Sequence, residues 1–505
     1  MNPMNRLLKS LNNRYVVLFL LSYLVGGFFH TLNINSLLTY SPEKVRLDET
    51  VLTSDDVIYI KPAVNFVNGK GWTDGSVGRQ QYFSRPPGYS LFIVPFYAFL
   101  GLKKGLFLLK FVQLFLFSLS SVCLLKLLEK LTVSNRFSFA VSLIYGVFPI
   151  ASGFVFYTLT EALTPAFLLF YVYFLQKGWS TSSKKSFVKA SLVLSFLLLI
   201  RPVLGMFLFP LLVLVFYSEG NQITFKKRLV KVFIYLTISL LPLLYWEIRV
   251  VNICREFPGL YPVYDKEVNS IYRPTHKAIW EFGKCWGISG KDFHEHIGPV
   301  WEQVIYPDSI QGSPIDRFIS IVPSEIVREV GREKIEKAFL AYQQTVKIQK
   351  QYLLSNSKLP FAIVVEEQKV IGLFNKLTTT YKSKHWLKYH VLVPMHYLKE
   401  MSFHSNLTLH IFQHPWRGNI GMEVGRILSL LIHFGVFVIL FFSFFVRRLT
   451  FFTRLLSLST LFYVLFLAYY FRELEERYTL PILPVLFLIA SEVIYKYNRL
   501  FSNKN

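Results

Sequence analysis

The chain of 505 residues is dominated by apolar runs long enough to cross a lipid bilayer. A transmembrane helix needs roughly 17 to 25 apolar residues, because the hydrocarbon core of a membrane is about 30 Å thick. Hydrophobic residues make up 52% of the sequence and charged residues only 17%, against about 25% charged residues in a typical soluble domain. The composition excludes soluble, disordered and fibrous proteins and predicts an all-α polytopic membrane protein. Its ten or so apolar runs lie near residues 15–34, 105–127, 137–154, 161–176, 187–201, 203–217, 229–250, 424–446, 454–471 and 479–495.

The charged residues between these runs predict the topology. Lys and Arg total 55 against 31 Asp and Glu, a net charge of +24. In a soluble chain this excess would indicate nucleic-acid binding, but here the basic clusters, such as 177–189 and 226–231, fall in loops on the side of the N-terminus. The positive-inside rule places that side in the cytoplasm. We therefore expect both termini in the cytoplasm, a bacterial inner (plasma) membrane, and no nucleic-acid partner.

This topology requires that the apolar stretch 87–101 does not cross the membrane. The stretch is short and has Pro95 in its middle, where proline interrupts helical hydrogen bonding. If it crossed, the basic loops that follow would all lie outside. It is therefore predicted to be an interfacial or re-entrant helix.

The predicted topology divides the chain into three parts. Residues 1–250 form a transmembrane module that carries a long first outer loop, 35–104, and residues 424–505 form the C-terminal transmembrane helices. Between them, 251–423 is long enough to fold as a separate extracytoplasmic domain, of mixed α/β or mainly α structure. A disulfide between Cys254 and Cys285 is conceivable there, although the cysteines lack the spacing of a zinc site.

Acidic residues stand at the start of two predicted outer helices. Asp55, Tyr59 and Ala63 share one helical face. Asp55 and Asp56 in a first turn, and Glu161 at the end of a capping-box pattern, are also what ordinary helix capping would select. Both acidic sites nevertheless lie on the same side, at the membrane edge, where ionisable groups are costly and usually functional.

Three arginines interrupt the outer side, which should be poor in positive charge. They are Arg85, Arg201 and Arg477. Each can snorkel or pair locally, as Arg477 could with Glu473 or Glu476, but a bound anion would explain all three together.

Two histidine pairs, His294 with His296 and His410 with His414, have spacings seen among metal ligands. Neither pair has a third ligand in register. We therefore interpret them as surface or packing residues, and a metal site stays unknown.

The motifs resemble those of the GT-C glycosyltransferases. The resemblance is nearest to the bacterial branch of protein O-mannosyltransferases, lipid A aminoarabinose transferases and Rhizobium core-galacturonate transferases. It covers roughly residues 10–220 and 425–495, whereas 251–423 resembles nothing known. The segments that carry it are Asp55-x-x-x-Tyr59-x-x-x-Ala63, Gly69-Lys70-Gly71, Arg85-Pro86-Pro87-Gly88-Tyr89, Thr160-Glu161-Ala162-Leu163, Arg201-Pro202 and Glu476-Arg477-Tyr478-x-Leu480-Pro481-x-Leu483-Pro484.

The resemblance implies a GT-C fold and a membrane enzyme that takes a sugar from a polyprenyl-phosphate donor and inverts its linkage. The acceptor would be a glycan, lipid or protein at the outer face, in cell-envelope glycan or glycolipid synthesis. Some relatives bind a divalent metal ion, for which no ligands are identified here. The implied catalytic residues are Asp55, Asp56 and Glu161, and the implied donor-binding residues are Arg85, Arg201, Arg477, Tyr59, Tyr89 and Tyr478.

Elementary chemistry supports the same roles. An acid such as Asp55 can accept the proton of an acceptor hydroxyl, a contribution worth about 10² to 10⁴ in rate. Arginines can stabilise the leaving phosphate, bidentately where geometry allows. Two other classes stay open: a lipid-linked glycan flippase or transporter, and an O-antigen polymerase or ligase.

Overall fold

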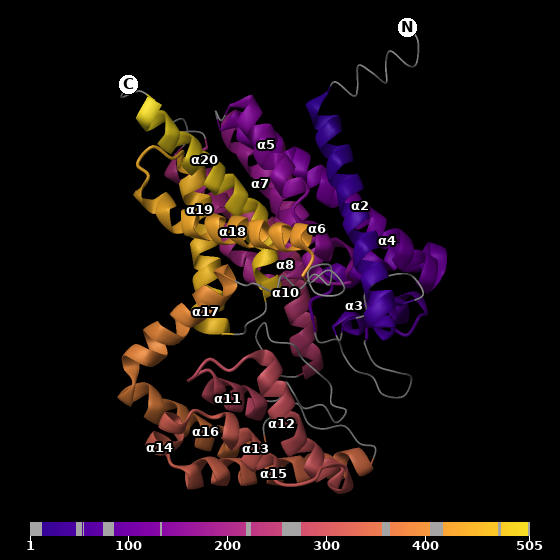
Figure 1. Ribbon diagram of the computed structural model, residues 1–505, viewed down its shortest axis with the longest axis vertical. Coiled ribbons are helices and arrows are strands. Elements are labelled where there is room, and N and C mark those ends of the chain that lie inside the picture. The colour runs from indigo at the N-terminus through magenta and orange to yellow at the C-terminus, as the bar shows by residue number, and fades with distance from the viewer. Residues whose placement is uncertain are drawn as a thin grey trace.

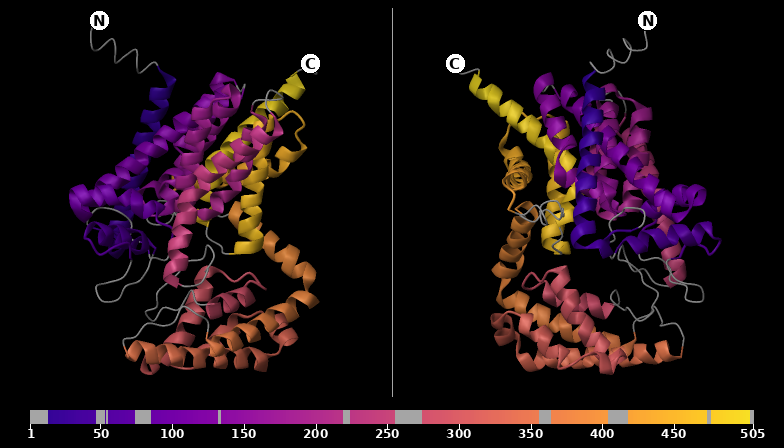
Figure 2. Two further views of the ribbon diagram at one scale, coloured as in Figure 1. Left: turned by 180° about the vertical axis from the view of Figure 1, so that it is seen from behind. Right: turned by 45° about the vertical axis from the view of Figure 1, so that its right-hand side comes forward.

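The structure is a computed structural model that describes residues 13–46, 53, 55–73, 85–131, 134–218, 224–254, 274–355, 364–403, 418–472 and 476–502. Within these ranges every regular secondary-structure element is a helix, which confirms the all-α class. Figure 1 shows two stacked units: a bundle of long helices and a smaller helical domain, and both views in Figure 2 keep them at opposite ends. The start of α2 and the end of α20 both lie at the end of the bundle away from the smaller domain (Figure 1).

The bundle contains the predicted apolar runs as helices. Its elements are α2 (Arg14–Tyr40), α3 (Asp56–Val67), α4 (Gly88–Lys130), α5 (Asn135–Gly146), α6 (Pro149–Gly153), η2 (Phe154–Phe156), η3 (Thr160–Ala162), α7 (Thr164–Thr181), α8 (Lys184–Ile200), η4 (Pro202–Phe207), α9 (Leu208–Tyr217), α10 (Phe225–Cys254), α18 (Ile420–Phe442), α19 (Phe451–Leu465), the π-helix η11 (Phe466–Phe471), η12 (Glu476–Ile482) and α20 (Leu483–Ser502).

Six described helices are long and apolar enough to cross a membrane, or seven if the bent pair α5 and α6–η2 counts as one span. The other three of the ten expected runs form α7, α8 and η4–α9, which are not among the six. Length separates two of them from the six, because η4–α9 is an apolar helix of only Pro202–Tyr217 and α8 has 17 residues. Although α18 is long and apolar enough to cross a membrane, it runs across the other helices in Figures 1 and 2.

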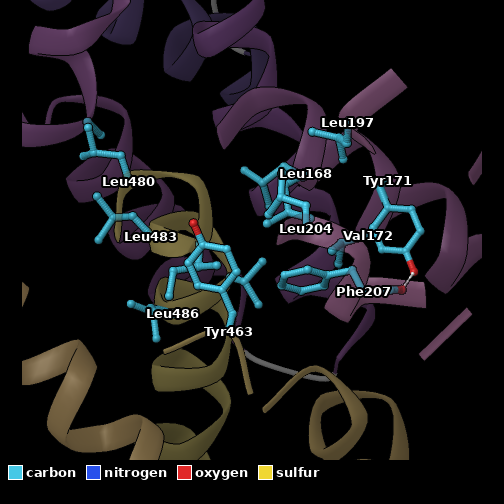
Figure 3. Close-up of a cluster of buried hydrophobic side chains, with 14 of the residues drawn as sticks. Leu168, Tyr171, Val172, Leu197, Leu204, Phe207, Tyr463, Leu480, Leu483 and Leu486 are labelled. Carbon is cyan, nitrogen blue, oxygen red and sulfur yellow. Dashed lines mark hydrogen bonds between the residues drawn. The ribbon is translucent and has the colours of Figure 1, made fainter. Parts of the chain in front are cut away.

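Side chains from distant parts of the chain fill the centre of the bundle. Figure 3 shows Leu168 and Phe207 facing Tyr463 and Leu483 across this core. The Tyr171 hydroxyl donates to the Phe207 carbonyl at 2.6 Å, which satisfies a buried polar group. The core therefore ties the short helices α7 to α9 to the C-terminal helices.

The stretch expected to be interfacial or re-entrant is a separate helical arm. Within α4 the backbone breaks at Gly101, whose φ of 70° lies in the left-handed region that glycine tolerates. Beyond the break the chain turns back on itself. The close approach of Gly105 to the arm shows this turn, since a Cβ at Gly105 would lie 2.7 Å from the Phe96 carbonyl oxygen. Residues 88–100 thus pack against the start of the following span instead of extending it.

The smaller domain has its own hydrophobic core. We call it the outer domain after the location that the charge distribution of the sequence predicts for it. Phe282, Ile297, Phe339 and Phe374 are all buried in it, and Cys285 is a buried free thiol. The described part is entirely helical, as the mainly α alternative predicted. Its elements are α11 (Pro274–Gly283), α12 (Gly290–Ile305), η7 (Pro307–Ser309), α13 (Pro314–Ile321), α14 (Ser324–Val330), α15 (Arg332–Leu354), α16 (Val365–Lys384) and the π-helix η8 (Lys388–Leu392).

The next helix, α17 (Val393–Ser402), returns to the bundle. Val393, Tyr397 and Met401 recur every four residues on one helical face and are buried in the core of the bundle. The core of the outer domain therefore ends near Tyr389, well before the predicted boundary at residue 423.

Candidate functional site

Five ionised side chains meet in one group, hereafter the ion cluster: Asp55, Arg85, Glu161, Arg201 and Arg477. Arg477 Nη2 donates to Asp55 Oδ2 at 2.7 Å, and its Nε lies 4.0 Å from Glu161 Oε1. Arg85 Nη2 lies 3.5 Å from Asp55 Oδ1, and Arg201 Nη2 lies 3.0 Å from Glu161 Oε1. Arg477 therefore links the two carboxylates that the sequence singled out separately.

The arginines keep both carboxylates ionised. Burial by itself raises the pKa of Asp55, but the charges of Arg85 and Arg477 outweigh it and hold that pKa below its usual value. The buried Glu161 carboxylate is likewise compensated by two cations, Arg201 and Arg477. Counted over the described members of the cluster, three positive charges face two negative ones, and such an excess of positive charge favours binding of an anion.

The two carboxylates differ in their access to solvent. The Asp55 side chain is 20% exposed and that of Arg85 is 33% exposed, whereas the Glu161 side chain is only 2% exposed. Glu161 also accepts a hydrogen bond from the Thr160 hydroxyl at 2.9 Å. Asp55 therefore forms the accessible edge of the ion cluster, and Glu161 forms its interior.

The neighbouring acid, Asp56, lies outside the ion cluster. Its backbone N–H donates to the Thr53 hydroxyl at 3.2 Å, and its carboxylate accepts from the Thr53 N–H at 3.1 Å. The same carboxylate is fully buried and pairs with Arg46. The capping interpretation thus describes Asp56, while Asp55, one residue earlier, has its side chain directed to Arg85 and Arg477.

Aromatic rings support the guanidinium groups. The Arg85 guanidinium carbon lies 5.8 Å from the centre of the buried Tyr59 ring. Arg201 and Arg477 both lie over the Tyr478 ring, at 5.0 and 5.7 Å. Such cation–π contacts orient an arginine without neutralising it, so each guanidinium keeps its charge for a ligand.

Tyr89, by contrast, is an interior residue. It is fully buried, and its hydroxyl donates to Gln113 Oε1 at 2.7 Å. The Gln113 amide in turn donates to the carbonyls of Val155 and Tyr157, at 2.6 and 3.3 Å. Gln113 therefore ties the segment after Arg85 to the segment before Glu161. Its only signal in the sequence is a polar amide within an apolar run.

Gly88 explains why the Arg85 motif contains a glycine. A Cβ at this position would lie 2.6 Å from the backbone carbon of Leu199 and 2.7 Å from the nitrogen of Ile200. Only a residue without a side chain allows this approach. The contact brings the segment that begins with Arg85 against the end of α8, immediately before Arg201.

The structure does not strengthen the metal interpretation. Within the described ranges no group of three or more His, Cys, Asp or Glu side chains is placed to hold a metal ion. His296 Nδ1 lies 2.7 Å from the Asp292 carbonyl oxygen of its own helix. His410 and His414, like Glu473, lie outside the described residues.

Comparison with known proteins finds weak similarity to solved structures. No protein-family model and no curated protein match the chain. Among solved structures, the crystal structure of ArnT from Cupriavidus metallidurans bound to undecaprenyl phosphate is similar over 97% of this chain and 79% of that chain, with 14% sequence identity and a TM-score of 0.33. The apo crystal structure of the same protein is similar over 95% of this chain and 77% of that chain, with 16% identity and a TM-score of 0.34.

Proposed function

We propose that this chain is an integral-membrane glycosyltransferase that moves a sugar from a polyprenyl-phosphate donor to an acceptor at the extracytoplasmic face. The observation that carries the proposal is the position of Arg477, which contacts Asp55 at 2.7 Å and lies 4.0 Å from Glu161. This arrangement supports the proposal, because it brings a carboxylate that can act as a base next to guanidinium groups that can bind a phosphate. Both are needed to displace a sugar from a phosphate.

The reaction breaks the bond between the anomeric carbon and the phosphate oxygen and forms a bond from that carbon to an acceptor hydroxyl oxygen. Asp55 accepts the proton of the hydroxyl, while Arg85 and Arg477 stabilise the negative charge that grows on the phosphate. In the free protein these same arginines lower the pKa of Asp55. When they turn to a phosphate their hold on Asp55 weakens, so donor binding makes Asp55 a stronger base.

Glu161 has a different role in this proposal. With its side chain 2% exposed and Arg201 at 3.0 Å, it holds the inner arginines in place and keeps the cluster from carrying too large an excess of positive charge. Tyr59 and Tyr478 orient the guanidinium groups that bind the donor phosphate. Asp56 and Tyr89 support the local fold of the site and do not contact substrate.

A buried charge favours a lipid-linked glycan flippase as the second candidate. Lys110 is 1% exposed within the membrane helix α4, and its Nζ lies 3.3 Å from His30 Nε2. Ionisable groups inside a membrane often mark transport paths. Movement of a fluorescent undecaprenyl-phosphate lipid across proteoliposomes, with no change in envelope glycans when the protein is removed, would favour this candidate.

The test of the transferase proposal combines binding and product analysis. Purified protein is titrated with undecaprenyl phosphate, and envelope glycans and glycolipids are analysed by mass spectrometry in host cells that lack the protein. We expect binding, and loss of one sugar from one envelope component. Wild-type protein restores that sugar and Asp55→Asn does not. Asp308→Asn is the matched control, because Asp308 is exposed on η7 of the outer domain. Restoration by Asp55→Asn as well would refute the role of Asp55.

A further inference from the structure

The end of the last-but-one bundle helix carries a fully buried arginine, Arg472. Its backbone has a φ of 53°, in the left-handed region that residues other than glycine rarely adopt. All three of its donor nitrogens bond to backbone carbonyls: Nε to Tyr469 at 2.8 Å, Nη1 to Lys284 at 3.0 Å, and Nη2 to Tyr389 at 2.7 Å. Tyr469 belongs to η11 of the bundle, whereas Lys284 and Tyr389 belong to the outer domain.

Lys284 returns the interaction in the opposite direction. It is 5% exposed, and its Nζ donates to the Tyr470 carbonyl of the bundle at 3.0 Å and to Glu281 Oε1 at 2.8 Å. Each unit therefore inserts one basic side chain that is bonded to the backbone of the other. We call this pair the latch.

The chemistry of the latch makes it specific in geometry. A buried guanidinium must satisfy its N–H groups, because an unmet buried donor costs about 1 to 3 kcal/mol, and more when it is charged. Arg472 meets this need with carbonyls from three separate segments, and its guanidinium carbon stacks 4.0 Å from the Tyr389 ring centre. Lysine cannot reproduce this planar fork. The bonds hold only when the outer domain sits at one position on the bundle.

The latch lies close to the ion cluster along the chain. Arg477, which links Asp55 and Glu161, follows Arg472 by five residues. Five residues of extended chain span at most about 18 Å. The outer-domain carbonyls that bond to Arg472, those of Lys284 and Tyr389, therefore lie near the segment that carries Arg477.

We propose that Arg472 is a positioning residue, which fixes the outer domain on the bundle next to the segment that carries Arg477, so that the outer domain forms the acceptor side of the site. This inference rests on the proposed transferase function. It predicts that loosening the latch leaves donor binding intact, since the ion cluster contains no outer-domain residue. Transfer to the acceptor should fall.

The test uses the full-length protein with Arg472→Lys, which keeps the charge and removes the fork. The matched control is Arg454→Lys, because exposed Arg454 lies near the opposite end of the same helix and also donates to a backbone carbonyl, that of Arg447. Spin labels at the exposed positions Thr39 and Ser320 report the distance between bundle and outer domain by pulsed electron paramagnetic resonance. Undecaprenyl phosphate titration reports donor-lipid binding, and mass spectrometry of cellular glycans reports transfer at equal membrane content.

For Arg472→Lys we expect a broadened distance distribution, an unchanged Kd for undecaprenyl phosphate, and product reduced by about tenfold to 10²-fold, because a misplacement of 1 Å can cost about 10²-fold. Arg454→Lys should match the wild type in all three. An unchanged distance distribution overturns the latch, and a broadened one with wild-type product overturns the positioning role. If Arg472→Lys does not fold, Lys284→Met is judged by the same criteria; it removes the returning bond to Tyr470 and the local bond to Glu281, and leaves the Arg472 bonds in place. Failure of the transferase proposal is recognised separately, because the wild type itself would then give no product.

Discussion

Replacing the two carboxylates of the ion cluster one at a time should give opposite kinds of defect. Asp55→Asn keeps the shape of the side chain and removes one negative charge. The side chains of Asp55 and Arg85 are 20% and 33% exposed, and ion pairs that keep contact with water contribute only about 0 to 1 kcal/mol. The variant should therefore fold. With three arginines against one carboxylate, it should bind undecaprenyl phosphate at least as tightly as the wild type.

The loss should appear in turnover. Removing a general base costs about 10² to 10⁴ in rate, which corresponds to about 3 to 5 kcal/mol in the barrier. Glu161→Gln should behave differently, because Glu161 is 2% exposed and faces Arg201 at 3.0 Å. Removing one partner of a buried ion pair costs about 3 to 5 kcal/mol of stability, so this variant should be recovered in low yield or unfold at a lower temperature.

The assay compares both variants with wild type and with the exposed control Asp308→Asn in one lipid nanodisc preparation. Thermal unfolding gives Tm, titration gives the Kd for undecaprenyl phosphate, and complemented cells give the glycan product. The reasoning is refuted if Asp55→Asn lowers Tm as much as Glu161→Gln does. It is also refuted if Asp55→Asn weakens donor-lipid binding, since removing a negative charge cannot increase the repulsion of a phosphate.

Three further predictions concern the framework of the site. Gly88→Ala places a Cβ 2.6 Å from the Leu199 backbone, and such overpacking costs about 1 to 3 kcal/mol of stability. Calorimetry should therefore show a lower Tm together with weaker undecaprenyl phosphate binding, and an unchanged Tm would contradict the close contact. Gln113→Leu removes the partner of three buried polar groups, the Tyr89 hydroxyl and the carbonyls of Val155 and Tyr157. Denaturant unfolding should show a loss of stability of about 1 to 3 kcal/mol for each group that finds no other partner. Burial lowers the pKa of His276 in the outer domain to about 3, so the unfolded state takes up the proton first as the pH falls. The free energy of unfolding is therefore full above pH 6.5 and falls below it, by about 2 kcal/mol at pH 5. Unfolding followed by circular dichroism between pH 7 and 5 should not show this loss for His276→Phe.

The sequence alone determined the membrane class, the positions of the apolar helices and the separate arm at 88–100. These features follow from local properties: hydropathy is summed along a segment, and a break such as Gly101 acts on its own neighbours. The sequence also selected the residues of the ion cluster, because an ionisable group at the edge of hydrocarbon is costly wherever it pairs.

Tertiary structure decided what each of those residues does. Asp55 and Asp56 are neighbours with the same side chain, and only the fold pairs one with Arg46 and the other with Arg477, which lies 422 residues further along the chain. The sequence does not predict what Gln113 and Arg472 bind, because both bond to backbone carbonyls, which every residue carries. Whether a polar group is exposed, capped or shared between distant segments depends on which surfaces pack together, and that is a property of the whole folded chain.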